Sequence, residues 1–168
     1  MNRPQPEEFA SFYQGYIDLV SDDVIGELED QATSFPTFVR SLPPEKMEYA
    51  YAPGKWTIKQ IVGHLIDNER ILAYRLLCLS RKDPTPLPGY DQNEYIAKSY
   101  YRTKDTETIL KEFEAVRRAN LFLYKSLQPT DLDYIGTANN HPISAKALLF
   151  VIAGHLNHHR KIIGERYL

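Results

Sequence analysis

Proline and glycine divide the chain into four long segments with helical periodicity, and this division most constrains the fold. In the first segment, from about Asp22 to Arg40, apolar residues recur at steps of three and four, as on one face of a helix. Pro36 falls inside this segment, so we expect it to kink the helix or to end it near Phe35. A shorter helix is indicated before it, over residues 7–19.

The second long segment begins with a capping box. In Thr57-Ile58-Lys59-Gln60, the Thr hydroxyl and the Gln side chain can satisfy each other's backbone donors, which predicts a helix from Thr57 to about Arg81. Three prolines and a glycine follow within residues 82–92 and predict a loop. The acidic and amide residues from Asp91 onward are typical of the start of a short helix, which we expect to end near Tyr101.

Two more long helices are predicted, from about Thr106 to Leu127 and from Ser144 to about Arg166. Ser144 is a favourable N-cap, whereas residues 128–142 are predicted to be irregular. No segment alternates as a half-buried strand does. The sequence therefore predicts an all-α fold, a four-helix bundle with short extra helices, in one domain over residues 1–168 with its core from about residue 22. The connections are long enough to allow a crossover.

Composition excludes several functional classes. The net charge is −2, without the basic excess that nucleic-acid binding requires. No apolar run approaches the roughly 20 residues of a membrane-spanning helix, and the first residues lack the apolar stretch of a signal peptide. The single cysteine, Cys78, cannot form an internal disulfide, which fits a reducing compartment. We therefore expect a cytoplasmic protein with no nucleic-acid partner and no membrane association.

Three of the five histidines fall in the stretch GHLNHHR, residues 154–160. At about 100° per residue, His155 and His159 lie about 40° apart on the inward face of the last helix. Such an i, i+4 pair can bind one metal ion. His158 lies about 60° to the other side, so it is the weaker candidate, with an outer-sphere or surface role favoured. Two hydrogen-bonded core histidines remain the alternative, because most catalytic zinc sites have three protein ligands.

His64 is the natural third ligand. It lies at the margin of the apolar stripe of the second helix, and Asn68 and Arg75 continue the same edge, at about 40° and 20° from it. A histidine followed by inward-leaning polar groups indicates the wall of a pocket, although spacing alone favours a residue at the boundary of the core. His141 is expected to be exposed in its loop. The sequence contains no H-E-x-x-H, E-x-x-H, Gly-rich phosphate loop, G-x-S-x-G or paired-Cys motif.

Three blocks of the sequence resemble the DinB/YfiT-like superfamily: YAPGKWTIKQIVGHLIDNERILAYR (51–75), PLPGYDQNEY (86–95) and LLFVIAGHLNHHRKIIGERY (148–167). The resemblance covers nearly the whole chain from about residue 22. It implies a four-helix bundle, commonly homodimeric, with zinc or nickel bound by His64, His155 and His159. It also implies divergent chemistry, since members are similar to thiol S-transferases, thiol-dependent isomerases and hydrolases.

Three imidazoles leave one tetrahedral position open, as in catalytic zinc sites. The position suits activation of water for hydrolysis, or binding of a substrate thiol as the thiolate. The candidates for catalytic roles are Asn68, which can orient a ligand or water, Arg75, which can bind a substrate carboxylate or form a structural salt bridge, and Asp91. Candidates for proton transfer are Asp67, Glu69, Asp91 and Glu94.

Glu69 points about 140° away from His64, which favours an ion pair with Arg117 or Arg118. We expect a metal-dependent enzyme acting on a small molecule, with a low-molecular-weight thiol as one candidate. The alternatives are a non-catalytic metal-binding stress-response or interaction protein, and a bundle whose histidines only pack.

Overall fold

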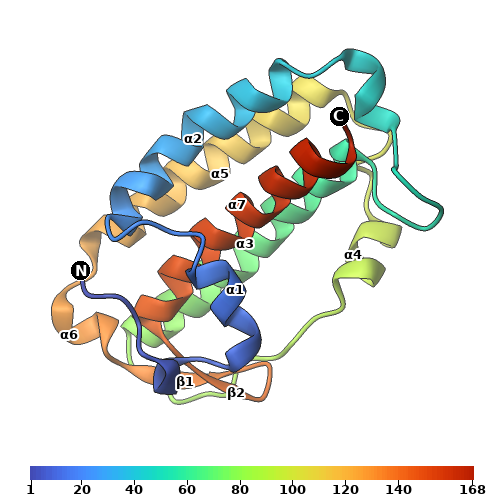
Figure 1. Ribbon diagram of the computed structural model, residues 1–168. Helices are drawn as coiled ribbons and strands as arrows, with labels where there is room; N and C mark the ends of the chain where they lie inside the picture. Colours follow the sequence, from blue (N-terminus) through green and yellow to red (C-terminus); the bar gives the residue numbers. More distant parts are fainter.

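Four long helices dominate the computed structural model, which describes residues 1–168, and they confirm the predicted four-helix bundle (Figure 1). They are α2 (Val24–Arg40), α3 (Ile58–Ser80), α5 (Thr106–Ser126) and α7 (Ala145–Arg166). The helices begin where the sequence predicts. The capping box is formed, with Gln60 N donating to Thr57 Oγ1 (3.2 Å) and Thr57 N donating to Gln60 Oε1 (2.9 Å). Ser144 Oγ likewise accepts from the backbone at the start of α7.

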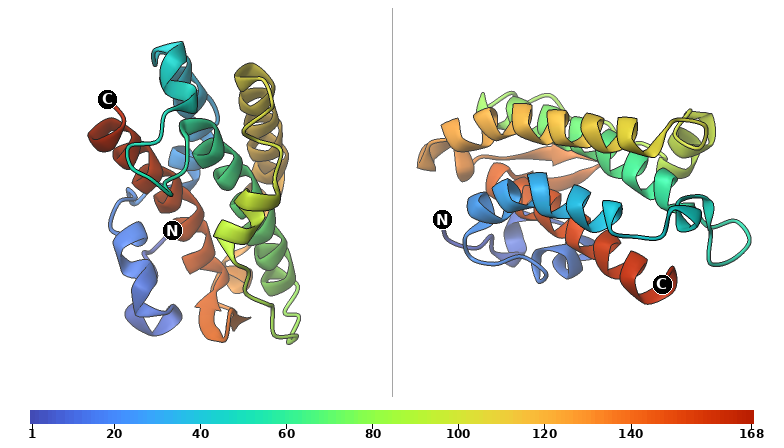
Figure 2. Two further views of the ribbon diagram at one scale, coloured as in Figure 1. Left: turned by 90° about the vertical axis from the view of Figure 1, so that its right-hand side faces the viewer. Right: turned by 90° about the horizontal axis from the view of Figure 1, so that it is seen from above.

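The order of the helices around the bundle is α2, α5, α3, α7 (Figures 1 and 2). Helices α2 and α3 follow each other in the sequence, yet both pack against α5 and α7 and lie across the diagonal. The connections therefore do not follow a simple up-and-down path. As a consequence, α3 and α7 are neighbours, although their central residues are some 90 positions apart in the chain.

Short elements surround one end and one side of the bundle. Residues 7–19 do not form one helix. They contain parts of two 3₁₀ turns, Pro6–Glu8 and Ser11–Tyr13, followed by the four-residue helix α1 (Gln14–Ile17), which packs on α7. The remaining pieces are a 3₁₀ turn at Pro44–Glu48, α4 (Gln92–Lys98) and α6 (Pro129–Leu132).

Of the two outcomes expected at Pro36, a kink or an end of the helix near Phe35, the second is wrong, because α2 continues through Pro36 to Arg40. Proline removes one backbone hydrogen bond, but Pro36 itself is buried and the apolar face continues to Val39, so burial offsets the loss.

The prediction that residues 128–142 are irregular is also wrong. They contain α6 and the strand β1 (Ile135–Ala138), which pairs antiparallel with β2 (His141–Ser144). The two turn residues, Asn139 and Asn140, have φ of 52° and 63°, the left-handed values that a two-residue hairpin turn requires and that Asn tolerates. This small hairpin covers the end of the bundle where α7 begins (Figure 1).

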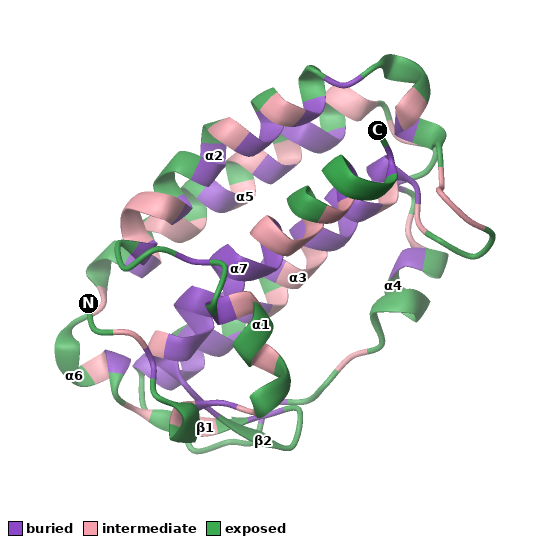
Figure 3. Cartoon of the chain, viewed as in Figure 1, coloured by how far each residue is buried: buried purple, intermediate pink, exposed green.

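Buried residues follow the inner faces of the four helices (Figure 3) and form two apolar clusters. On α3 one cluster ends at Ile66 and the other begins at Leu72; on α7 they are divided between Ala153 and Leu156. Polar residues occupy the boundary between the clusters. No helix of the chain is both long and apolar enough to span a membrane.

A buried ion pair at this boundary joins the four helices. Arg117 Nε of α5 donates to Glu69 Oε1 of α3 at 2.7 Å, and both side chains are almost fully buried, 1% and 3% exposed. Arg117 also donates to Gln31 Oε1 of α2, and Gln31 Nε2 donates to the Ala153 carbonyl of α7. The expectation that Glu69 forms an ion pair is therefore confirmed, with Arg117 as its partner.

Candidate metal centre

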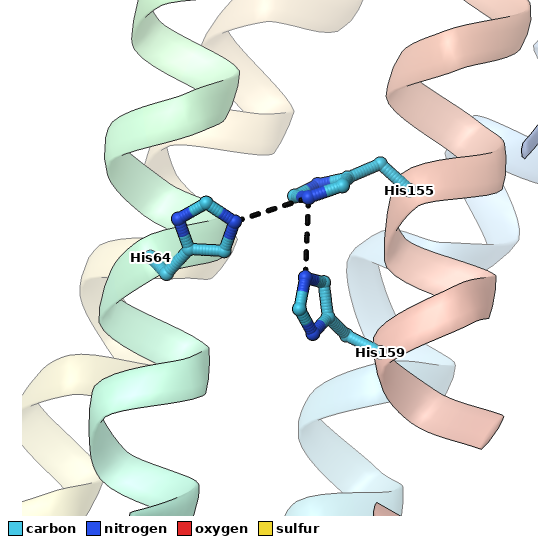
Figure 4. Close-up of side chains that lie close together, drawn as sticks. All are labelled: His64, His155 and His159. Atoms are coloured by element: carbon cyan, nitrogen blue, oxygen red, sulfur yellow. Dashed lines mark hydrogen bonds between the residues drawn. The ribbon is translucent and has the colours of Figure 1, made fainter. Parts of the chain in front are cut away.

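Three imidazole rings converge between α3 and α7 (Figure 4). The Nε2 atom of His155 lies 3.0 Å from Nε2 of His64 and 3.1 Å from Nε2 of His159. One ligand nitrogen from each ring lies within 4.8 Å of the other two. The structure thus brings together the three histidines that the spacing and the resemblance selected. His64 is not a boundary residue, because Trp56 packs on its ring and only 1% of the residue is exposed.

The donor set fits a divalent cation. An ion with tetrahedral bonds of about 2.0–2.1 Å holds its nitrogens about 3.3 Å apart, close to the observed separations. Each contact between two neutral imidazoles needs one N–H and one lone pair, and Nε2 of His155 has either one N–H or one lone pair for its two neighbours. A cation satisfies three lone pairs at once. The Nδ1 atom of His159, which would carry the proton when Nε2 binds an ion, is buried without a partner.

Burial keeps all three rings neutral near pH 7. It lowers the pKa of His64 to about 4 and, together with the charges of His64 and His158, that of His159 to about 3. Burial also holds the pKa of His155 well below its usual value, with a smaller contribution from the neighbouring histidines. Neutral imidazole is the form that binds a metal, so the site is ready for an ion without losing protons first.

The metal-free protein is expected to lose stability as the pH falls from about 6.5 to 4. In the unfolded chain His64 takes up a proton near pH 6.5, whereas the buried ring does so only at about 4. Unfolding therefore takes up protons in this window, and its free energy drops by about 3 kcal/mol from His64 alone at the lower end. Urea unfolding at pH 7 and pH 4 measures the drop. The His64→Gln variant should show a shallower pH dependence, and an identical dependence would contradict the burial argument.

The Nδ1 side of the His155 ring contacts the Asn68 amide, which in turn contacts the Tyr90 phenol. Asn68 Nδ2 lies 3.0 Å from His155 Nδ1, and the Tyr90 hydroxyl donates to Asn68 Oδ1 at 2.7 Å. When Nε2 binds a metal, Nδ1 carries the proton and needs an acceptor. Rotating the Asn68 amide by 180° provides its oxygen to His155 and its NH₂ to Tyr90. Asn68 thus contacts the His155 ring, and its predicted role toward a ligand or water stays a prediction.

A glycine precedes a histidine in both helices, and each glycine allows a tyrosine of another segment to approach the helix closely. A Cβ on Gly63 would lie 2.2 Å from the ring of Tyr101, and one on Gly154 would lie 2.0 Å from the Tyr16 carbonyl oxygen. The Tyr16 ring consequently meets the His155 ring edge-on, with centroids 5.3 Å apart. Gly154 thus lets the segment that carries Tyr16 pack against His155.

Two cavities flank the histidines. The larger, about 300 Å³, lies against α1 and is lined by His155, Asn68 and Arg75 and by residues of the loops before α4 and at the hairpin turn. The smaller, about 200 Å³, is lined by His159, Trp56 and several aromatic residues at the other end of the bundle. Tyr90, from the loop before α4, and Asn139, from the hairpin turn, line the larger cavity.

None of the four candidate carboxylates lines either cavity. Glu69 is bound to Arg117, and Asp67 accepts a hydrogen bond from Tyr101 at 2.8 Å. Asp91 is exposed and caps α4 by accepting from two backbone amides, while Glu94 forms a surface pair with Lys98. Besides the His155 imidazole, the polar groups at the larger cavity are amides, phenols and one guanidinium.

The other two histidines are not part of the triad, although the His158 ring meets the His159 ring edge-on, with centroids 5.3 Å apart. His158 is half-buried and its ring packs edge-on against Tyr16, in keeping with its weaker candidacy as a ligand. His141 is exposed at the hairpin, as expected. Sequence reasoning missed Tyr16 and Tyr90. The Gly-His pairs were the available signal for Tyr16, because a glycine inside a helix marks a close approach by another segment.

The sequence matches one family model and is similar to bacterial proteins. The family model described as the DinB superfamily matches residues 27–163. A protein of Oceanobacillus iheyensis named "putative metal-dependent hydrolase" is 28% identical over 164 residues, covering 95% of this chain and 92% of its own. A protein of Bacillus mycoides with the same description is 26% identical over 153 residues, covering 86% of each chain.

Among solved structures, YfiT from Bacillus subtilis, described as a probable metal-dependent hydrolase with an unusual four-helix bundle topology, is similar in fold. The two structures superpose with a TM-score of 0.70, covering 98% of this chain and 90% of YfiT, at 18% identity. The diagonal arrangement of α2 and α3 is consistent with such a topology.

Proposed function

The chain belongs to the DinB superfamily, and from this premise we propose that it is a divalent-metal-dependent hydrolase of a small molecule, with His64, His155 and His159 as the ligands. The observation that carries the proposal is the convergence of three buried Nε2 atoms beside a cavity. The names of the two relatives from Oceanobacillus and Bacillus support the reaction class.

The residues around the ligands have definable roles. Zinc or nickel, when bound there, supplies Lewis acidity, which polarises a carbonyl group and lowers the pKa of water to about 7. Asn68 holds the proton on Nδ1 of His155, so that Nε2 stays an electron-pair donor. Trp56 and Tyr16 pack on the rings of the triad and limit access of bulk water. The larger cavity supplies the space for a substrate beside His155.

Thiol S-transfer is the second candidate, and the two cavities favour it. A transfer needs two substrates at the reacting centre at once, and the cavities approach the triad from different sides, one at His155 and the other at His159. A coordinating thiol is deprotonated by the metal itself, so the reaction does not need a carboxylate base. Neither cavity is lined by a carboxylate.

Assays of the untagged, metal-loaded protein separate these functions. A panel of activated esters and amides tests hydrolysis, and a low-molecular-weight thiol with an electrophile tests transfer. Turnover of an ester or amide that is lost with a chelator and restored by zinc or nickel supports the hydrolase. Turnover only when a thiol is consumed supports the transferase. A stoichiometric metal without any turnover supports the non-catalytic alternative, and a protein without metal under all conditions contradicts the proposal.

A homodimer, also proposed from the resemblance, is tested by sedimentation.

A further inference from the structure

A buried arginine without an acidic partner lies in the larger cavity. Arg75 is 4% exposed, and its one strong hydrogen bond is from Nη2 to the carbonyl oxygen of Pro88, at 2.6 Å. No carboxylate forms a salt bridge with it. Arg117, the other buried arginine, is 1% exposed and pairs with Glu69. A guanidinium carries five N–H donors, so most of the donors of Arg75 are left without an acceptor. A buried charge is ordinarily paired, and the charge of Arg75 has no partner in the protein.

The surroundings of Arg75 offer further donors and no negative charge. It is the only residue lining this cavity that carries a full charge at pH 7. Burial raises the pKa of Tyr13, and the adjacent Arg75 guanidinium offsets part of the rise through its charge and a hydrogen bond. Burial likewise raises the pKa of Tyr90, against the charge of Arg75. Both phenols therefore stay protonated beside the guanidinium. Tyr13 can donate a hydrogen bond there, and Tyr90, whose hydroxyl donates to Asn68 Oδ1, is free to donate when the Asn68 amide is rotated by 180°.

We propose that Arg75 binds a carboxylate group of the substrate, so that the enzyme acts on small monoanionic molecules. The planar fork of a guanidinium matches the two oxygens of a carboxylate. At its own end of the cavity, away from the proposed ion, Arg75 supplies one positive charge, which balances one carboxylate; the second negative charge of a phosphate dianion would have no partner among the residues lining that end. The inference rests on the proposed function, because it assigns the substrate class of that same site.

The placement of Arg75 also sets the size of the substrate. Asn68, which contacts His155, precedes Arg75 by seven residues on α3, a rise of about 10 Å. Helical side chains lean toward the N-terminus, so the guanidinium reaches back toward the histidines. Arg75 and His155 line one cavity of about 300 Å³. A molecule held at both ends would place its carboxylate within about 10 Å of the triad, which is the length of a small metabolite.

Equilibrium binding tests the inference without requiring turnover. The probes are 4-phenylbutyrate, its neutral analogue 4-phenylbutan-1-ol and 3-phenylpropylphosphonate, titrated by NMR into the metal-loaded protein. We expect the carboxylate to bind at least about 10-fold more tightly than the alcohol, because hydrogen bonds to charged groups are the strong ones. Arg75→Gln should weaken carboxylate binding by about 10- to 100-fold and leave alcohol binding unchanged. Arg75→Lys keeps the charge but not the planar fork, so its affinity for the carboxylate should lie between those of the wild-type protein and Arg75→Gln.

Arg118→Gln is the matched control, because it removes the same charge from an exposed position on α5. Equal affinity of the wild-type protein for the carboxylate and the alcohol would overturn the inference even if Arg75→Gln fails to fold. Tighter binding of the phosphonate would overturn the assignment to a carboxylate. Metal content of each sample is measured in parallel. A wild-type protein with a full complement of metal but no carboxylate preference disproves this inference alone, whereas a protein that binds no metal disproves the proposed function.

Discussion

The His155→Ala variant is expected to purify without a stoichiometric metal ion and to lose all metal-dependent turnover. His155 is the central ligand, because its Nε2 atom lies within about 3 Å of the Nε2 atoms of both other rings. Its loss leaves two imidazoles, which are too few for most catalytic zinc sites. Loss of an outer-sphere partner alone typically costs 10- to 100-fold in metal affinity, so loss of a ligand should cost more than about 100-fold. Competition with a chromophoric chelator measures the affinity.

His158→Ala is the matched control, because it removes a histidine from the same helix three residues away. The His158 ring packs against Tyr16 and lies outside the cluster of ligand nitrogens. We expect this variant to bind one ion per chain with nearly unchanged affinity. A loss of metal from His158→Ala equal to that from His155→Ala would mean that the ion is bound by a different set of histidines.

The Glu69→Gln variant should show the largest loss of stability. It leaves Arg117 as an uncompensated charge inside the bundle, where both partners are almost fully buried. Breaking one side of such a pair typically costs about 3–5 kcal/mol. For a domain of this size the melting temperature should fall by about 10 °C. Since the Arg117 network reaches Gln31 and the Ala153 carbonyl, two residues before His155, weaker metal binding should accompany the loss.

Glu107→Gln makes the same chemical change in an exposed pair. Glu107 binds Arg40 at 2.8 Å, but both side chains are largely open to solvent, where the pair is screened and contributes little. Thermal unfolding of the two variants side by side gives the comparison. Similar melting temperatures would show that burial of the Glu69–Arg117 pair does not stabilise the bundle in the way described.

Much of the bundle was predictable because its signals are local. The capping box at Thr57, the N-cap at Ser144 and the apolar periodicity each act within one helix, and all three match the structure. The hairpin at residues 135–144 was missed, although Asn139-Asn140 is a turn signal. The order of the helices around the bundle depends on packing between distant segments, which a periodicity argument does not contain.

The histidines of the site could be predicted from the sequence, but the residues packed around them could not. His155 and His159 share a helix face, so their proximity follows from spacing alone. The burial of His64 depends on Trp56 packing on its ring, and the coupling of Asn68 to Tyr90 depends on how a loop folds back. Asp91 was a candidate because of its residue type, but its carboxylate caps α4. The pairing of Glu69 with Arg117 was indicated, because the angle on the helix directs Glu69 away from the histidines.

The most direct test of the three-histidine centre is a crystal structure of the zinc-loaded protein with an anomalous difference map at the zinc edge. The account predicts one peak between α3 and α7, at about 2.0–2.1 Å from Nε2 of His64, His155 and His159, with a fourth position open to the larger cavity. A peak bound by only two of these nitrogens, or an ion located elsewhere in the bundle, would contradict it.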